Sequence, residues 1–325
     1  MSTAASTGAS GIIDLALAGA AVVVTGGGSG IGAATARLLG AAGASVTLVG
    51  RRRALLEQTA EAVEKTGGRA VTVPADLADP ATPSRVIEAA MEAFGRIDGL
   101  VNNAAMCQHR PLAEWDTAGF DEQLATNIRA PYFLIQAALP ALRESRLRSV
   151  VNISSSSGTL RLSGQSVYGM SKCALDYLTQ SLAGELAPDR IRVNCIAPGP
   201  VDTPIHATWA DDLDEAYRWL ESQVPLGRIG DPADLARWIA LLLSPVSSLR
   251  SVFTDSPCFS RRRPPAAVPS HAAPPQVRGI TCPPSTGSTT PVRNDDTGLS
   301  SRAIQRARSA GSPIRPSGTW LSSHR

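Results

Sequence analysis

The chain has 325 residues, 43% of them hydrophobic, and its formal net charge of +3 at pH 7 is unevenly distributed. Residues 1–248 carry 20 basic and 25 acidic side chains, a net charge of −5, whereas residues 249–325 carry 11 Arg and three Asp, a net charge of +8. A mildly acidic body argues against nucleic acid as the main partner, and because no run of 18 apolar residues occurs, no membrane-spanning helix is expected.

Strand and helix signals alternate through the first three quarters of the sequence. Short β-branched runs predict strands, and segments with helical apolar periodicity separate them. The predicted strands are 20–25, 45–50, 70–77, 99–105, 148–155 and 191–199, and the predicted helices are 33–44, 54–67, 80–95, 119–145, 166–186 and 231–244. Asp231 is a candidate cap for the last helix, with Pro232 at its first position. The alternation implies right-handed crossovers and a doubly wound α/β fold, with a parallel sheet covered by helices on both faces.

The composition changes near residue 249. Residues 249–325 hold 11 of the 24 Pro and show no long apolar periodicity. Such a segment cannot bury enough surface to offset its ordering entropy. We therefore predict one catalytic domain at residues 1–248 and a disordered Pro-, Ser- and Arg-rich tail at 249–325.

The turn after the first predicted strand is rich in glycine. It reads Thr25-Gly26-Gly27-Gly28-Ser29-Gly30-Ile31-Gly32 and leads directly into a helix. Glycines let the backbone approach a pyrophosphate closely, and the free N–H groups at a helix N-terminus attract the anion. The arrangement predicts a nucleotide site, although a flexible glycine loop is the alternative.

The sequence SVYGMSK places Tyr168 four residues before Lys172. Side chains at this spacing share one helix face, and a nearby ammonium lowers the pKa of a phenol toward the range in which it can exchange protons. A Y-x-x-x-K pattern also arises by chance, so its meaning depends on its partners.

The glycine turn with its T-G-x-x-x-G-x-G spacing, the NNAA element at 102–105 and the Tyr168/Lys172 pair together resemble the short-chain dehydrogenase/reductase family. The resemblance covers about residues 15–248 and implies a Rossmann-like sheet. It also implies an NAD(P)-dependent oxidoreductase that reduces a ketone or aldehyde to an alcohol, or the reverse.

The resemblance assigns catalytic roles residue by residue. Ser155, 13 residues before Tyr168, orients the carbonyl oxygen, and Ser154 and Ser156 are the alternatives within the run of four serines. Tyr168 is the general acid/base, Lys172 holds the ribose hydroxyls and lowers the tyrosine pKa, and Asn127 holds a water that resupplies the proton.

The residues at the end of the second predicted strand indicate whether the cofactor is NAD or NADP. An acidic residue there binds the ribose 2′-OH of NAD, but this sequence has Gly50 followed by Arg51, so NADP is favoured over NAD. The resemblance assigns adenine contact to Asp76 with Leu77, ribose contact to Asn103, and nicotinamide contact to Pro198, Gly199 and Thr203. The predicted cofactor-binding residues are Thr25, Gly26, Ser29, Gly30, Ile31, Gly32, Arg51, Asp76, Leu77, Asn103, Tyr168, Lys172, Pro198, Gly199 and Thr203.

Several features leave the substrate open. His109 and His206 flank the expected substrate mouth, and Trp209, Tyr217 and Trp219 fall where relatives have a mobile lid; loop exposure and plain packing are the alternatives. A 3-oxoacyl thioester, a polyketide-type ketone, a sugar or a steroid would suit this scaffold. A cofactor-binding protein without turnover is the competing class, and nucleic-acid binding through the tail is a third.

No metal site is expected, because the five Cys form no C-x-x-C pair. The first 15 residues have no basic side chain and no apolar core typical of a signal peptide, so a cytoplasmic location is expected.

After residue 248 a family member normally forms one more strand containing Val-Asp-Gly-Gly, and this sequence continues LRSVFTDSPCFSRRR instead. We interpret this as a missing edge strand, caused by a frameshift or by a natural extension. Sequencing the gene tests the frameshift: the hypothesis fails if no single-base change restores that strand. Loss of the strand would put a homotetramer in doubt and leave a homodimer through the Tyr168 helix.

Overall fold

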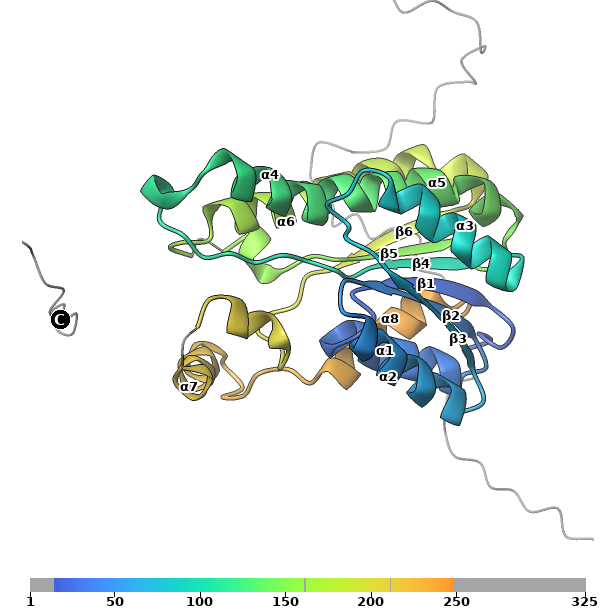
Figure 1. The fold of residues 1–325 in the computed structure, drawn as a ribbon, viewed down its shortest axis with the longest axis horizontal. Helices are drawn as coiled ribbons and strands as arrows, with labels where there is room; N and C mark the ends of the chain where they lie inside the picture. Colours follow the sequence, from blue (N-terminus) through green and yellow to red (C-terminus); the bar gives the residue numbers. More distant parts are fainter. Residues whose placement is uncertain (1–14, 161, 211, 248–325) are drawn as a thin grey trace, which may run out of the picture. The chain divides into compact units, whose positions relative to one another are not determined.

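The computed structural model describes residues 15–160, 162–210 and 212–247. Within them a six-stranded parallel sheet has the order β3-β2-β1-β4-β5-β6, which confirms the predicted doubly wound fold (Figure 1). The strands are β1 (Ala21–Thr25), β2 (Ser45–Gly50), β3 (Arg69–Pro74), β4 (Gly99–Asn102), β5 (Ser149–Ile153) and β6 (Arg192–Ile196).

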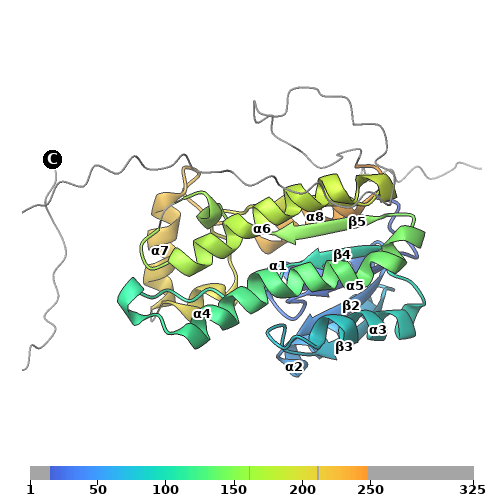
Figure 2. The same ribbon diagram turned by 90° about the horizontal axis from the view of Figure 1, so that it is seen from above.

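Helices cover both faces of the sheet, as Figure 1 and the turned view in Figure 2 show. One face carries α3 (Thr82–Phe94), α5 (Ala130–Glu144) and α6 (Ser166–Glu185). The other carries α1 (Gly30–Ala41), α2 (Arg53–Lys65) and α8 (Pro232–Leu243). α4 (Thr117–Leu124) precedes α5, and α7 (Leu213–Gln223) lies beyond the carboxyl ends of the strands.

Each face has its own apolar core. Leu100, Leu134 and Val193 belong to the core beneath α3, α5 and α6, and Val24, Leu39 and Ile239 belong to the core beneath α1, α2 and α8. Strands buried on both faces read as continuous β-branched runs, which is why β1 was recognisable as AVVVT.

Several predicted elements differ in detail: the strands predicted at 99–105 and 191–199 end at Asn102 and Ile196, and the helix predicted at 33–44 begins at Gly30. The helix predicted at 119–145 is divided by a π-helical turn, Ala125–Arg129, between α4 and α5. Such turns are typical of functional sites. The third predicted strand ends at Pro74 rather than at residue 77. The predicted cap of α8 is confirmed, because the Asp231 carboxylate accepts a hydrogen bond from Ala233 N at 2.8 Å.

Residues 248–325 lie outside the described residues, so the predicted tail, the domain boundary and the replaced edge strand lie there too. Among the described strands, β6 forms the edge of the sheet on that side. No helix in the described ranges combines the length and the apolar character that crossing a membrane requires.

A buried carboxylate joins the amino ends of β1 and β4. Asp98 has 0% exposure and accepts hydrogen bonds from Ala21 N at 2.9 Å, Ser145 Oγ at 2.9 Å and the Arg96 guanidinium at 2.7 Å. Burial raises the pKa of the Asp98 carboxyl, but the hydrogen bonds from Arg96, Ala21 and Ser145 outweigh burial and leave this pKa below its ordinary value of 3.8.

We expect Asp98→Asn to lower the free energy of unfolding by about 2–4 kcal/mol, because it leaves buried donors without an acceptor. Since the folded pKa lies below the unfolded one, the wild-type contribution is complete above about pH 4 and is lost as the pH falls further. Urea unfolding from pH 2 to pH 7 measures both effects. The matched control is Glu61→Gln on exposed α2, expected to cost no more than about 0.5 kcal/mol. Equal stability of Asp98→Asn and wild type would contradict the account.

Candidate active site

The strand order reverses between β1 and β4, and ligands of open parallel sheets bind beyond the carboxyl ends of the strands at such a point. The glycine turn follows β1, the NNAA element follows β4, the serine run follows β5 and the Pro198–Gly199 turn follows β6. The topology therefore brings together segments that lie up to about 180 residues apart in the sequence.

Thr25 and Asn103 fasten the ends of β1 and β4 to each other. The Thr25 hydroxyl accepts hydrogen bonds from Asn103 N at 2.9 Å and Ala104 N at 3.0 Å, and Asn103 Nδ2 donates to Thr25 O at 2.8 Å. A Cβ at Gly26 would lie 2.7 Å from Asn103 Nδ2. Thr25 and Asn103, both predicted to bind the cofactor, thus fix the carboxyl ends of β1 and β4 to each other through these hydrogen bonds.

The glycine turn fits a dinucleotide pyrophosphate. A Cβ at Gly32 would lie 2.2 Å from Gly26 O, so only glycine permits this close turn. Gly30 has φ +51° and lies against Thr203, whose Cγ2 would be 2.8 Å from an added Cβ. Ser29 makes no side-chain cap and the first turn of α1 has no acidic residue, so nothing there competes with an anion for the helix N-terminus. Ile31 packs against the adjoining apolar core.

The three arginines that follow β2 make different contacts. Arg51 is exposed and has no hydrogen bond or ion pair with any described residue. Arg52 donates to Ser29 Oγ at 3.1 Å, and Arg53 lies 3.7 Å from Glu57. The sequence did not indicate the Arg52–Ser29 contact, because it depends on how the two loops meet.

The remaining predicted cofactor residues lie at the strand ends. Asp76 accepts a hydrogen bond from Ala78 N at 2.9 Å, which shapes the turn after β3, and Leu77 is buried in the core. Pro198 O accepts from Ser156 N at 2.8 Å, which joins the loop after β6 to the serine run. A Cβ at Gly199 would meet nothing within 4 Å, so the backbone there borders open space.

One turn of α6 is fixed to the end of β5. Lys172 is 2% exposed and its Nζ donates to Ile153 O at 2.8 Å. The Ser154 hydroxyl donates to Lys172 O at 3.2 Å and is therefore engaged in structure. Ser155 is half-buried, and its side chain lies close enough to the Tyr168 phenol to lower the pKa of that group, which favours Ser155 over Ser154 as the predicted catalytic serine.

Asn127 lies in the π-helical turn and is 1% exposed. Its side chain accepts from Met106 N at 2.8 Å and donates to Met106 O and Ser171 Oγ, both at 2.9 Å. The amide thus positions the loop after β4 and the α6 turn. That Asn127 also holds a water in a proton relay stays a prediction.

The pKa of Tyr168 departs from our expectation. Burial, with a smaller effect of Cys107, raises this pKa far above 10, and the hydrogen bond to Ser155 only partly opposes the rise. Lys172 Nζ lies 5.6 Å from the centre of the Tyr168 ring and hydrogen-bonds to Ile153 O instead. We expected Lys172 to lower the pKa of the Tyr168 phenol. With protein groups alone this expectation is wrong, because burial of the phenol has the largest effect and raises its pKa. Burial also lowers the pKa of Lys172 to about 8.

An aromatic cluster joins the loop after β4 to the predicted lid segment. The His109 ring stacks on Trp209 with centroids 4.9 Å apart, and His206 lies edge-on to Trp209 and Tyr217. His206 is 7% exposed, so the alternative of a loose loop residue does not hold for it, whereas Trp219 is 51% exposed. Gln165, which sequence reasoning missed, lies 2.7 Å from the His109 ring nitrogen.

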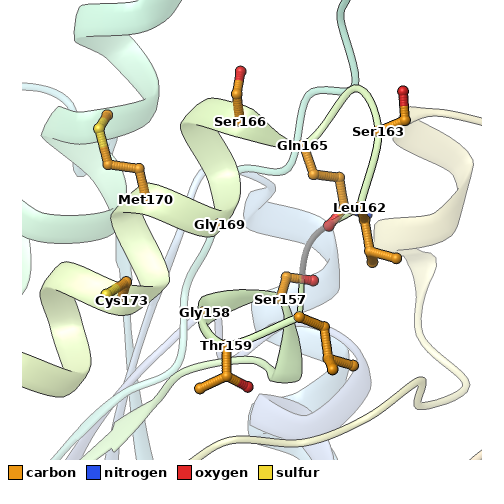
Figure 3. Close-up of a pocket in the computed structure, with 11 residues that line it drawn as sticks. Ser157, Gly158, Thr159, Leu162, Ser163, Gln165, Ser166, Gly169, Met170 and Cys173 are labelled. Carbon is orange, nitrogen blue, oxygen red and sulfur yellow. The ribbon is translucent and has the colours of Figure 1, made fainter.

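A cavity of about 620 Å³ lies between the loop after β5 and the start of α6 (Figure 3). Leu162, Gln165, Gly169, Met170 and Cys173 are among its lining residues, and none of the four predicted catalytic residues lines it. The cavity therefore adjoins the site without containing its reactive groups. The described ranges contain no cluster of three or more His, Cys, Asp or Glu suited to a metal ion.

Comparison with known proteins gives consistent results. A family model described as enoyl-(acyl carrier protein) reductase matches residues 26–251. An uncharacterized oxidoreductase of Mycobacterium tuberculosis is 39% identical over 70% of this chain and 86% of that protein. The L-rhamnose 1-dehydrogenase (NAD(P)+) of Azotobacter vinelandii is 37% identical over 69% of this chain and 89% of its own length. A crystal structure of a short chain dehydrogenase from Burkholderia cenocepacia in complex with NADP has TM-score 0.66 and 32% identity, covering 72% of this chain and 95% of that one.

We expect Gly32→Ala to weaken NADPH binding at least tenfold (about 1.4 kcal/mol), because the methyl group displaces Gly26 O and the N–H groups beside it. A fluorescence titration with NADPH measures the effect. Gly184→Ala on exposed α6 is the matched control, since an added Cβ there meets nothing within 4 Å. That control should bind NADPH as wild type does. Unchanged affinity in Gly32→Ala would contradict the proposed pyrophosphate site.

Proposed function

Because the chain belongs to the short-chain dehydrogenase/reductase family as an NAD(P)-dependent oxidoreductase, we propose that it interconverts a ketone or aldehyde with an alcohol through Tyr168, Ser155 and Lys172. The observation that supports this most directly is that buried Tyr168 and buried Lys172 lie together, with Lys172 Nζ 5.6 Å from the centre of the Tyr168 ring, and that Ser155 acts on the pKa of the same phenol. A phenol, a hydroxyl and an ammonium so arranged can hold and protonate a carbonyl oxygen.

The proposed roles follow from the contacts. Ser155 Oγ accepts from Ser157 N at 3.1 Å, which holds the side chain in place and leaves its own proton available to a substrate oxygen. Tyr168 Oη exchanges the proton with that oxygen. Lys172 is held by Ile153 O and supplies positive charge behind the phenol. The cofactor, when bound, supplies or accepts the hydride.

The raised pKa of Tyr168 determines the protonation state in which this residue enters the reaction. The chain's own residues keep the phenol protonated at neutral pH, and a protonated phenol is the proton donor that carbonyl reduction needs. Oxidation of an alcohol needs the phenolate instead, so it requires an additional positive charge near the oxygen. We propose that Tyr168 enters carbonyl reduction in its protonated form.

The proposed preference for NADP rests on Arg51. Its exposed guanidinium makes no hydrogen bond or ion pair with any described residue. At the position where NAD-dependent enzymes carry a carboxylate, this chain has Gly50. We expect Arg51→Asp to lower the ratio of kcat/KM for NADPH over NADH by about tenfold or more, because a charge-assisted contact with the 2′-phosphate is lost and a repulsion is added. Arg52→Gln is the comparison, since Ser29 already engages that side chain. A ratio that changes only in Arg52→Gln would overturn the assignment to Arg51.

Tyr168→Phe is expected to lower kcat for ketone reduction by at least about 100-fold while NADPH affinity stays within a few-fold of wild type. The assay measures NADPH oxidation with a panel of sugars, cyclic ketones, steroid ketones and 3-oxoacyl thioesters, including substrates of the rhamnose dehydrogenase type. Binding of NADPH by wild type without turnover of any carbonyl or alcohol in the panel would instead support a binding protein without catalysis.

We propose that the protein forms a homodimer through α5 and α6, which run alongside each other (Figure 2). Met170, Cys173 and Tyr177 are exposed on α6 at the i, i+3 and i+7 positions of one face, and Tyr132 and Phe133 are exposed on α5. A second copy of this face would cover the apolar side chains.

We therefore expect Tyr177→Arg to shift the protein from dimer to monomer in sedimentation velocity experiments, because it places a charge within that face, where the second copy would bury it. Glu61→Arg on exposed α2 is the control and should leave the sedimentation coefficient unchanged. A monomeric wild type, or a Tyr177→Arg variant that stays dimeric, would contradict this interface.

A further inference from the structure

The wall between the loop after β4 and the segment that leads into α7 consists of two stacked rings. His109 and Trp209 lie with their ring planes 8° apart and their centroids 4.9 Å apart. The Gln165 amide lies 2.7 Å from His109 Nε2, so the stack is also tied to the residue that precedes α6. Three separate segments thus meet in one surface, which we name the aromatic wall (His109, Gln165 and Trp209).

The aromatic wall is close to the reactive phenol. Gln165 precedes Tyr168 by three residues, about one helical turn. On the other side, Thr208 Oγ1 donates to Cys107 O at 2.6 Å, and buried Cys107 lies close enough to Tyr168 and Lys172 to influence the pKa values of both. The wall and the start of the Tyr168 helix therefore lie at the same end of the sheet, and we take the wall to border the space in front of Tyr168.

The wall is uncharged. Burial, and more weakly the neighbouring His206, lower the pKa of His109, so its imidazole is neutral near pH 7. Gln165 and Trp209 cannot carry charge. The adjacent charged groups are already engaged, since Arg110 Nη1 lies 3.5 Å from Asp116 Oδ2 and Asp202 accepts from Tyr217 Oη at 2.9 Å. A carboxylate or phosphate placed here would lose hydration without gaining a described cation.

We infer, on the basis of the function proposed above, that the aromatic wall selects uncharged ring compounds: cyclic ketones and alcohols whose ring packs against Trp209 while a polar substituent meets Gln165 or His109. Flat and ring-shaped molecules gain from stacking on aromatic faces, and the neutral amide and imidazole can each hydrogen-bond to a hydroxyl or carbonyl group. The wall is thus a specificity determinant separate from Ser155, Tyr168 and Lys172, which act on the reacting carbonyl alone.

The first experiment compares two ligands of nearly the same shape, the neutral 4-oxocyclohexanecarboxamide and the anionic 4-oxocyclohexanecarboxylate. Calorimetry measures their binding to full-length Tyr168→Phe loaded with NADP+, so the result does not depend on turnover. The carboxamide is expected to bind about tenfold more tightly or better. Equal binding, tighter binding of the carboxylate, or binding of neither would overturn the inference.

The same comparison on Arg161→Gln tests the one cation that the sequence places in residues 157–165. The preference for the carboxamide should be unchanged there. A preference that appears only after removal of Arg161 would show that this arginine, and not the wall, decides the charge of the substrate.

The second experiment tests whether the Trp209 ring favours cyclic substrates. It compares kcat/KM for cyclohexanone with kcat/KM for the open-chain ketone 2-hexanone. Trp209→Leu should reduce the cyclohexanone preference about three- to tenfold, and Trp209→Phe should restore part of it. Trp238→Leu is the matched control, because Trp238 is 60% exposed on α8. An unchanged preference in Trp209→Leu would overturn the ring assignment. Failure of wild type to reduce any ketone would refute the proposed function, while the calorimetric test of the wall would still apply.

Discussion

The ammonium of Lys172 is the constraint on which the site depends. A lysine with 2% exposure must satisfy its charge inside the protein, and it does so with Ile153 O at the end of β5. The same turn of α6 is held by the Ser154 hydroxyl through Lys172 O and by Asn127 through Ser171. Tyr168 is thereby fixed above the strand ends, because α6 cannot rotate or slide without breaking these buried hydrogen bonds.

The proposed catalytic residues and the proposed substrate-selecting residues come from different parts of the fold. Tyr168, Ser155 and Lys172 sit on or beside regular elements whose hydrogen bonds are buried, and such placement suits groups that must be positioned closely. His109 and Trp209 come from loops that differ in length and composition among proteins of one fold. In the function proposed here, residues on the fold's regular elements act on the reacting carbonyl group, and residues of the loops after β4 and β6 contact the rest of the substrate.

Much of the fold could be predicted because buried parallel strands and glycine turns leave strong local signals. The AVVVT run and the glycines after it located β1 and the nucleotide turn, and Asp231-Pro232 located the start of α8. Tertiary contacts were not predictable in this way. The π-helical turn at Asn127, the Arg52–Ser29 contact and the His109–Gln165 pair depend on how distant segments meet. The pKa of Tyr168 was predicted with the wrong sign, since a spacing of four residues reveals a neighbouring charge but not the degree of burial.

The most direct test compares the unfolding free energy of wild type and Lys172→Met as a function of pH. Because the folded pKa of Lys172 is about 8 and the unfolded value is 10.5, the charge destabilises the fold below pH 8, and this cost disappears as the pH rises to 10.5. The account predicts that Lys172→Met is more stable than wild type at pH 7 by roughly 1–3 kcal/mol, that this advantage shrinks between pH 8 and 10.5, and that the variant has no turnover. A variant that is less stable at pH 7, or that keeps wild-type activity, would contradict the claim that a strained buried cation serves the tyrosine.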